Sequence, residues 1–330
     1  MPSAIPLDAF FGRLQARLPP SLAAPFGLCR RLATAFRGDV MAVFELPLRT
    51  ASPGLDFSVR LEQLGQCRDA AAAALPAAAR ELLAAREAGE FTAAFLPSVW
   101  LEYDLRRGER VLPISCFRVS EAPSEWVAGQ LLPLVGASLP AAALAELVAA
   151  FATLPAAARP LYLFDLAARG RPGLRLELAA EPRVVAGWLA GLGATAQAEV
   201  LEQLAAFWGD GDRPHVSVDF DGAWAPRVGL ENSFRGQPPG EARWRAKLEQ
   251  WAAAGLCSRD EVELLLAWPA VETPGAADWP RGSDERPLPG WLITCLSHLK
   301  LAQAPGGELE IKAYLLFQYL ARETRSWPSR

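Results

Sequence analysis

The chain has 330 residues, of which 51% are apolar and 21% charged, so it has ample material for a sizeable hydrophobic core. Its formal net charge is only −4, with acids and bases interspersed, which gives no electrostatic support to a nucleic-acid partner. The sequence has no run of about 18 apolar residues and does not begin with a basic segment followed by an apolar one, so we expect neither a membrane span nor a secretory signal.

The cysteines are odd in number and widely separated: Cys29, Cys67, Cys116, Cys257 and Cys295. They form no Cys-x-x-Cys pair and no cluster with histidine, so the sequence predicts neither a disulfide framework nor a structural zinc site. Cysteines at such spacing are typical of a reducing compartment, and we expect a cytoplasmic protein.

An αββ unit, one helical segment followed by a β-hairpin, recurs five times along the chain. The helical segments fall at about residues 7–37, 68–90, 124–154 and 181–208 and from Pro239 onward. The predicted strands, paired in hairpins, are 39–49 with 54–64, 97–105 with 110–119, 160–169 with 173–179, 214–220 with 225–234, and 290–303 with 307–320. No linker is long enough to separate domains, so we predict one domain over residues 1–330.

Most of the predicted strands have one apolar and one polar face. The second strand, for example, sets Phe57 and Val59 against Ser58 and Arg60, whereas the fourth and fifth strands show no clear alternation. The polar faces could be solvated on an open sheet or could line a closed barrel. Closure is favoured because it leaves no sheet edge exposed. The sequence thus predicts an α+β fold, with five αββ repeats forming a ten-stranded antiparallel barrel that has a polar lumen and is surrounded by helices.

The fifth unit is the longest of the repeats. Ser258 and Glu261 have the spacing of a capping box and predict the start of a second helix there. The irregular segment 269–288, rich in Pro, Gly and Trp, precedes the last hairpin. We expect a surface loop, at a position that would suit a lid over one mouth of the barrel.

Four lumenal residues carry a resemblance to a known family. Lys312-Ala313-Tyr314 on the last strand resembles the Lys-x-Tyr pairs with which indole prenyltransferases hold the diphosphate. Glu45 on the first strand and Arg60 on the second resemble that family's glutamate, which contacts the nucleophile, and its diphosphate-binding arginine. Together with the five αββ units, these positions make the chain similar to the ABBA, or PT-barrel, aromatic prenyltransferases, including the cyanobactin-type branch that prenylates peptides.

The resemblance implies a prenyltransferase that moves a dimethylallyl or geranyl group from its diphosphate to an aromatic or peptide side-chain acceptor in natural-product tailoring. Glu45 would be the catalytic residue, accepting or orienting the acceptor's proton. No resident metal or cofactor is expected, with Mg²⁺ accompanying the diphosphate as an open alternative. The expected diphosphate-binding residues are Arg60, Arg175, Arg227, Lys300, Lys312 and Tyr314, with Arg118 a weaker candidate. The expected prenyl and acceptor pocket comprises Trp100, His215 and His298.

The chain also departs from the family pattern. It has one Lys-x-Tyr where the fungal enzymes have more, and no DDxxD-type run. The predicted lumen carries many acids, which would repel a diphosphate unless bases or Mg²⁺ neutralise them. These acids are Asp56, Glu62, Glu102, Asp104, Glu177, Asp219 and Glu231.

Structural roles are the alternatives for the same residues. Glu45 and Arg60 could form an ion pair across the first hairpin, and Lys312 could pair with Glu310 or a nearby aspartate. A hydrogen-bonded structural role is the default for His215 and His298. The rival functions are a non-catalytic barrel that binds a peptide or small ligand and, ranked last, a metal-assisted hydrolase using the lumenal carboxylates with a histidine.

Overall fold

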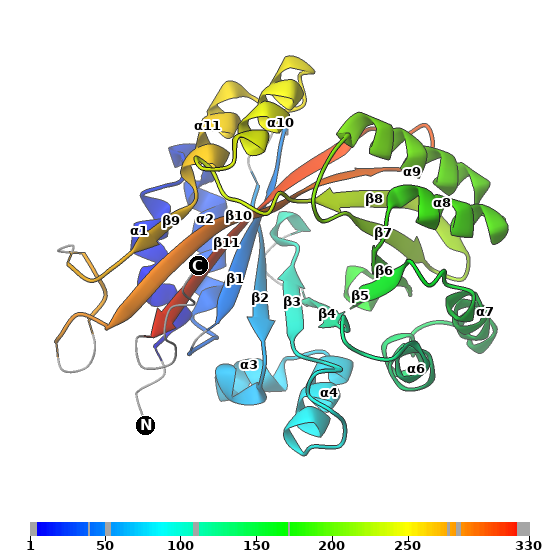
Figure 1. The fold of residues 1–330 in the computed structure, drawn as a ribbon. Helices are drawn as coiled ribbons and strands as arrows, with labels where there is room; N and C mark the ends of the chain where they lie inside the picture. The colour runs from blue at the N-terminus through cyan, green and yellow to red at the C-terminus, as the bar shows by residue number, and fades with distance from the viewer. Residues whose placement is uncertain are drawn as a thin grey trace.

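Ten strands pair in sequence order and close on themselves, as the alternation predicts. The computed structural model describes residues 5–38, 40–49, 54–107, 112–170, 172–275, 278–281 and 285–321. All strand pairs are antiparallel, and β11 pairs with both β10 and β1, which closes the barrel (Figure 1). The barrel strands are β1 (Met41–Pro47), β2 (Asp56–Leu61), β3 (Val99–Tyr103), β4 (Ile114–Arg118), β5 (Arg159–Asp165), β6 (Leu174–Ala179), β7 (His215–Phe220), β8 (Trp224–Asn232), β10 (Gly290–Gln303) and β11 (Glu310–Ala321).

Helices connect successive hairpins and lie outside the barrel (Figure 1). They are α1 (Phe11–Gln15), α2 (Ala23–Ala33), α3 (Asp69–Ala73), α4 (Ala77–Glu87), α5 (Ser124–Trp126), α6 (Leu132–Val135), α7 (Ala141–Ala152), α8 (Pro182–Gly191), α9 (Thr195–Trp208), α10 (Ala242–Ala253) and α11 (Arg259–Ala267). Short helical turns are η1 (Leu7–Phe10), η2 (Pro20–Leu22), η3 (Leu64–Gln66), η4 (Leu105–Arg107), η5 (Val127–Leu131) and η6 (Ala167–Arg169). Among the described residues, none of the helices combines the length and hydropathy that a membrane span requires.

The hydrophobic core lies between the barrel and its helical coat. Phe44 of β1 stacks on Phe317 of β11 with ring centroids 4.9 Å apart, and Phe11 of α1 packs edge-on against both rings. Phe57 of β2 joins the same buried cluster. These are the apolar strand faces of the sequence pattern, so burial of this side against helices leaves the alternate residues inside the barrel.

The capping box that begins α11 is confirmed. Ser258 Oγ accepts the backbone N–H of Glu261 at 3.1 Å, and the Glu261 carboxylate accepts the N–H of Ser258 at 2.6 Å. This reciprocal pair satisfies two N–H groups that the first turn of a helix leaves without partners.

The segment before the last hairpin differs from expectation. It contains an unpredicted strand, β9 (Ala270–Glu272), which pairs with the first part of β10. Trp279 packs edge-on against Phe10, and Glu272 accepts from Arg13 at 2.7 Å. The described part of 269–288 therefore packs against η1 and α1, and none of it lines the lumenal cavity. The expectation of an irregular surface loop is wrong where β9 forms, and the lid over one mouth of the barrel stays a prediction.

Strand direction gives the barrel two different ends. The hairpin turns lie at one end, called the hairpin end, and the helical connections at the other, called the helix end. Glu45, Asp56 and Lys312 lie toward the hairpin end, whereas Arg118 and His215 lie at the helix end.

Candidate functional site

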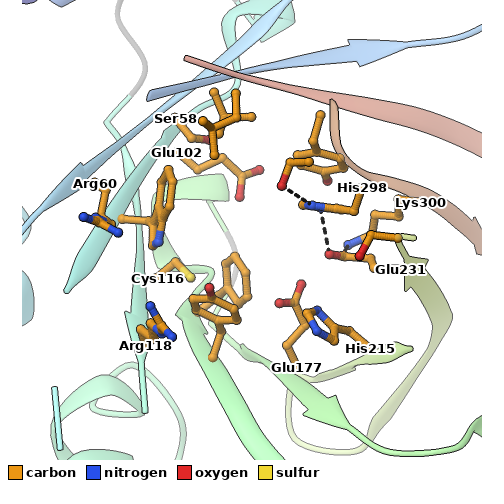
Figure 2. Close-up of a pocket in the computed structure, with 18 of the residues that line it drawn as sticks. Ser58, Arg60, Glu102, Cys116, Arg118, Glu177, His215, Glu231, His298 and Lys300 are labelled. Atoms are coloured by element: carbon orange, nitrogen blue, oxygen red, sulfur yellow. Dashed lines mark hydrogen bonds and ion pairs between the residues drawn. The ribbon is translucent and has the colours of Figure 1, made fainter. Parts of the chain in front are cut away.

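A cavity of about 350 Å³ lies in the lumen, and all ten barrel strands contribute side chains to its wall. Two of its walls differ in charge (Figure 2). Arg60 of β2 and Arg118 of β4 lie on one side, with Cys116 between them and the centre. Glu177, His215, Glu231, His298 and Lys300 lie on the other side, on strands β6, β7, β8 and β10.

Eight of the predicted site residues line this cavity, and three do not. Those in the lining are Arg60, Trp100, Arg118, Arg175, His215, His298, Lys300 and Tyr314. Glu45 and Lys312 are buried outside the lining, toward the hairpin end, at 2% and 9% exposure. Arg227 also lies outside the lining, in a half-exposed bidentate pair with Glu310 at 2.8 and 3.2 Å.

Ion pairs fill the lumen toward the hairpin end. Lys312 Nζ donates to Glu45 Oε1, and the Tyr314 hydroxyl also hydrogen-bonds this carboxylate. Burial opposes ionisation of Glu45, but Lys312 beside it holds the pKa of this carboxyl below its ordinary value. Arg175 donates to Asp219 at 2.6 and 3.1 Å in a fully buried bidentate pair.

Two proposed structural pairings are corrected by the strand register. Glu45 lies opposite Asp56 and Arg60 lies opposite Met41, so the ion pair across the first hairpin is wrong. Arg60 donates instead to Glu62, two residues along its own strand face, at 2.5 Å. Lys312 pairs with Glu45 rather than with Glu310, because β11 also pairs with β1.

Asp56 lies next to Glu45 and competes with it for positive charge. It accepts the Leu105 N–H at 3.0 Å and pairs with Arg106 at 2.8 Å. Burial, reinforced by Glu45 and outweighing the attraction of Arg106, raises the pKa of Asp56 to about 7.

Glu231 is the centre of a buried polar cluster on the other wall. Lys300 Nζ donates to one of its oxygens, and His298 Nε2 lies 3.1 Å from the other. Glu177 hydrogen-bonds the same carboxylate. Burial, reinforced by Glu231, raises the pKa of Glu177 well above its ordinary value, so Glu177 is the proton donor of this pair. Burial opposes ionisation of Glu231, but Lys300 and then His298 hold its pKa well below the ordinary value.

The histidines differ in their surroundings. Burial lowers the pKa of His215 to about 4, so its ring is neutral at neutral pH. The ring of His298 stacks on Tyr314 with centroids 3.9 Å apart and an angle of 21° between the planes. Glu177, His215 and Glu231 each place one ligand atom within 4.8 Å of the others, so these three residues could hold a metal ion.

Gly229 of β8 makes room for this cluster. A Cβ atom at this position would lie 2.4 Å from Ser217 Oγ and 3.2 Å from Lys300 Cε. The glycine therefore lets Lys300 extend along the lumenal face to Glu231.

Arg118 is partly exposed and has a different environment from the buried lumenal cations. Its Nε donates to Ser120 Oγ at 3.3 Å, and among the described residues no carboxylate lies within salt-bridge distance of it. Tyr162 of β5 lies directly opposite it and also lines the cavity. An anionic ligand would therefore meet uncompensated positive charge at Arg118.

Sequence reasoning missed several members of the lining, chiefly Tyr162, Phe164 and Arg213. Strand β5 contains Pro160 and an irregularity between Pro160 and Tyr162, which hides its alternation. The apolar side chains of Tyr162 and Phe164 also resemble core residues in the sequence. Pairing in register with β6, whose alternation is clear, is the signal that places them inside.

The sequence has no significant match among family models or curated proteins. Solved structures do resemble it: PriB in a binary complex with product diphosphate has a TM-score of 0.50 and 17% identity, covering 94% of this chain and 96% of that chain. A 5-dimethylallyl tryptophan synthase from Streptomyces coelicolor, in complex with DMASPP and Trp, has a TM-score of 0.48 and 18% identity, covering 99% and 98%. The likeness to PriB confirms the predicted PT-barrel fold over nearly the whole chain.

Proposed function

From the PT-barrel fold and its lumenal cavity, we propose that the chain is a prenyltransferase that moves an allylic group from its diphosphate to an aromatic acceptor. The two similar proteins support this proposal through their bound molecules, product diphosphate in one and DMASPP with Trp in the other. A dimethylallyl or geranyl donor fits the proposal. The acceptor is a free aromatic molecule or an aromatic side chain within a peptide, as in natural-product tailoring.

The reaction explains why arginines and aromatic rings share one cavity. Breaking the bond between the allylic carbon and its oxygen leaves an allyl cation and an anionic diphosphate. Guanidinium donors stabilise the leaving group best where little water competes. The faces of Trp100, Tyr162 and Tyr314 would stabilise the cation until the aromatic carbon attacks it and releases a proton. The observation that carries the proposal is this combination of arginines and aromatic faces around one lumenal cavity.

The ion pairs suggest different roles for the predicted diphosphate ligands. We assign direct contact to Arg60, Lys300 and Tyr314, which line the cavity, and add Arg118. Arg175 stays paired with Asp219 and contributes to the electrostatic potential in the cavity. Lys312 and Glu45 act through Tyr314, whose hydroxyl Glu45 binds, so Glu45 is a positioning residue in this proposal. Arg227 has no contact with the cavity and is assigned no role in binding.

The test is direct incubation with dimethylallyl or geranyl diphosphate and a panel of acceptors. The panel contains tryptophan, tyrosine, small phenols, and peptides that carry each aromatic residue. Mass spectrometry detects the prenylated acceptor, and a coupled assay measures diphosphate release. The double variant Arg60→Ala/Arg118→Ala should abolish both signals, whereas Arg30→Ala, on an exposed face of α2, should retain them.

A non-catalytic barrel is the second candidate, and one observation favours it. Lys300, Lys312 and Arg175 each already have a carboxylate partner, as expected of a lumen that balances its own charge. Such a protein would gain thermal stability from a peptide or small ligand, gain none from prenyl diphosphates, and form no product.

A further inference from the structure

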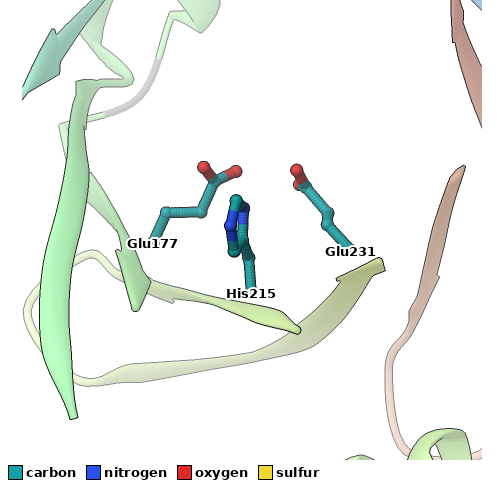
Figure 3. Close-up of side chains that lie close together, drawn as sticks. All are labelled: Glu177, His215 and Glu231. Atoms are coloured by element: carbon teal, nitrogen blue, oxygen red, sulfur yellow. The ribbon is translucent and has the colours of Figure 1, made fainter. Parts of the chain in front are cut away.

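Three side chains suited to metal coordination converge on one wall of the cavity. Glu177 of β6, His215 of β7 and Glu231 of β8 each present one ligand atom, and these atoms lie within 4.8 Å of one another (Figure 3). His215 lies opposite Glu231 in the register of β7 with β8, and Glu177 lies on the same lumenal face of β6. Ligand atoms about 2.1 Å from a metal ion are at most ~4.2 Å apart, so small side-chain rotations complete the geometry.

Ser217 gives a second, independent indication of a ligand at this place. It lies directly opposite Glu177 and two residues from His215 on the same face of β7. The residue is 2% exposed, and its Oγ has no hydrogen-bond partner among the residues that the structure describes. A buried hydroxyl without a partner is unfavourable, and an ion or an ion-bound water beside it would supply the missing contact.

Glu231 retains the capacity to bind an ion despite its two basic partners. A carboxylate has about four lone-pair positions; Lys300, His298 and the proton of Glu177 use three of them, and a bound ion would take the place of that proton. Metal-binding carboxylates are usually held by such hydrogen bonds, which orient them toward the ion. The imidazole of His215 favours Mn²⁺, Co²⁺ or Zn²⁺ over Mg²⁺ and Ca²⁺.

We propose that Glu177, His215 and Glu231 bind one divalent transition-metal ion, with Ser217 or a water molecule beside it and an open position toward the cavity. Lys300 and His298 position Glu231. The role of this ion rests on the proposed function: its open position takes an oxygen of the prenyl diphosphate. It adds positive charge on a wall where Glu231 already balances Lys300.

The test is a titration of the full chain, freed of metal with a chelator, with Co²⁺ and then Mn²⁺. The visible absorption of Co²⁺ reports nitrogen and oxygen ligation, and the electron paramagnetic resonance signal of free Mn²⁺ gives the stoichiometry. The proposal expects one ion per chain. Glu177→Gln and His215→Gln should each weaken binding by at least the roughly 10- to 100-fold typical of losing an outer-shell partner.

Glu102→Gln is the matched control. Glu102 is a carboxylate that lines the cavity outside the cluster, and it pairs with Arg169 at 2.9 Å. Its binding of Co²⁺ should equal that of the parent chain. Glu231 is left unaltered, since its loss would leave Lys300 buried without a partner. Near-ultraviolet circular dichroism checks each variant, and Glu177→Gln alone decides if His215→Gln does not fold. Equal binding by parent and Glu177→Gln, or no Co²⁺ spectrum, overturns the site.

Inorganic diphosphate separates the metal site from its role. Added to the Co²⁺ form, it should change the visible spectrum, and an unchanged spectrum overturns the placement of the ion against the substrate. The proposed function fails separately: a Co²⁺ site without prenyl transfer refutes the function and keeps the site. Prenyl transfer by a chain that binds no Co²⁺ refutes the site and keeps the function.

Discussion

Lys312 of β11 donates to Glu45 of β1 across the strand pair that closes the barrel. Both side chains are buried, and the Tyr314 hydroxyl hydrogen-bonds the same carboxylate. The contact therefore links the first and last barrel strands and fixes the hydroxyl of a cavity residue.

Lys312→Met should destabilise the protein more than the simultaneous removal of both charges does. The single variant leaves Glu45 buried without its charge partner, which costs about 3–5 kcal/mol in comparable buried pairs. Glu45→Gln/Lys312→Met removes both charges and should recover much of that loss. Urea unfolding of the parent, both single variants and the double variant gives the coupling energy. Additive effects of the two substitutions would contradict the pairing.

Asp56 should make stability fall as pH rises toward neutrality. The unfolded chain releases this proton near the ordinary value of 3.8, whereas the folded chain holds it until about pH 7. The unfolded state therefore binds fewer protons in that interval, so the contribution of this group is full below pH 4 and is lost as pH rises through 7.

Asp56→Asn removes this titration and keeps an oxygen for the Leu105 N–H. Relative to the parent chain, its free energy of unfolding should rise by about 2–4 kcal/mol between pH 4 and pH 8. Urea unfolding across that range measures the difference, and Asp210→Asn on the exposed surface is the control. A pH-independent difference would show that Asp56 ionises normally.

Gly229→Ala should destabilise the barrel chiefly through a contact with Ser217 Oγ. The new methyl group would lie 2.4 Å from Ser217 Oγ, and relief of such overpacking costs about 1–3 kcal/mol. Adding Ser217→Ala removes the oxygen and should restore most of the stability. Thermal and urea unfolding compare the two variants, and equal stability of both would locate the strain elsewhere.

Arg118→Ala should slow prenyl transfer without unfolding the protein. Loss of one donor to a developing anionic charge typically costs about 10²- to 10³-fold in rate. Arg118→Lys keeps the charge but loses the guanidinium geometry, so its rate should lie between those of the parent chain and Arg118→Ala. Diphosphate release at saturating acceptor measures all three, with Arg30→Ala as the control. Parent-like rates for Arg118→Ala would place the leaving group elsewhere.

The barrel could be predicted from the sequence because apolar and polar residues alternate along its strands and do not alternate along its helices. Phe57 and Val59 against Ser58 and Arg60 already define inside and outside for β2. The extra strand β9 was missed because Ala270–Glu272 is too short to show a period. Strand β5 was ambiguous because Pro160 and its local irregularity interrupt the pattern.

The site was predictable in part, for a physical reason. Alternation assigns a side chain to the lumen but not to a depth along the barrel axis, so Glu45 and Lys312 could not be told from cavity residues. Nor does it give partners across the barrel. The pairing of Lys312 with Glu45 depends on closure by β11 and β1, which are far apart in the sequence. The convergence of Glu177, His215 and Glu231 likewise depends on the register of three strands.

Prenyl transfer itself is the most direct test of a lumen built for an allylic diphosphate. The purified chain is incubated with dimethylallyl diphosphate and the acceptor panel, and each acceptor is analysed by mass spectrometry. We expect one acceptor to gain a single dimethylallyl group in place of a hydrogen, with an equal amount of diphosphate released. A folded chain that neither binds dimethylallyl diphosphate nor modifies any aromatic or peptide acceptor would contradict the account.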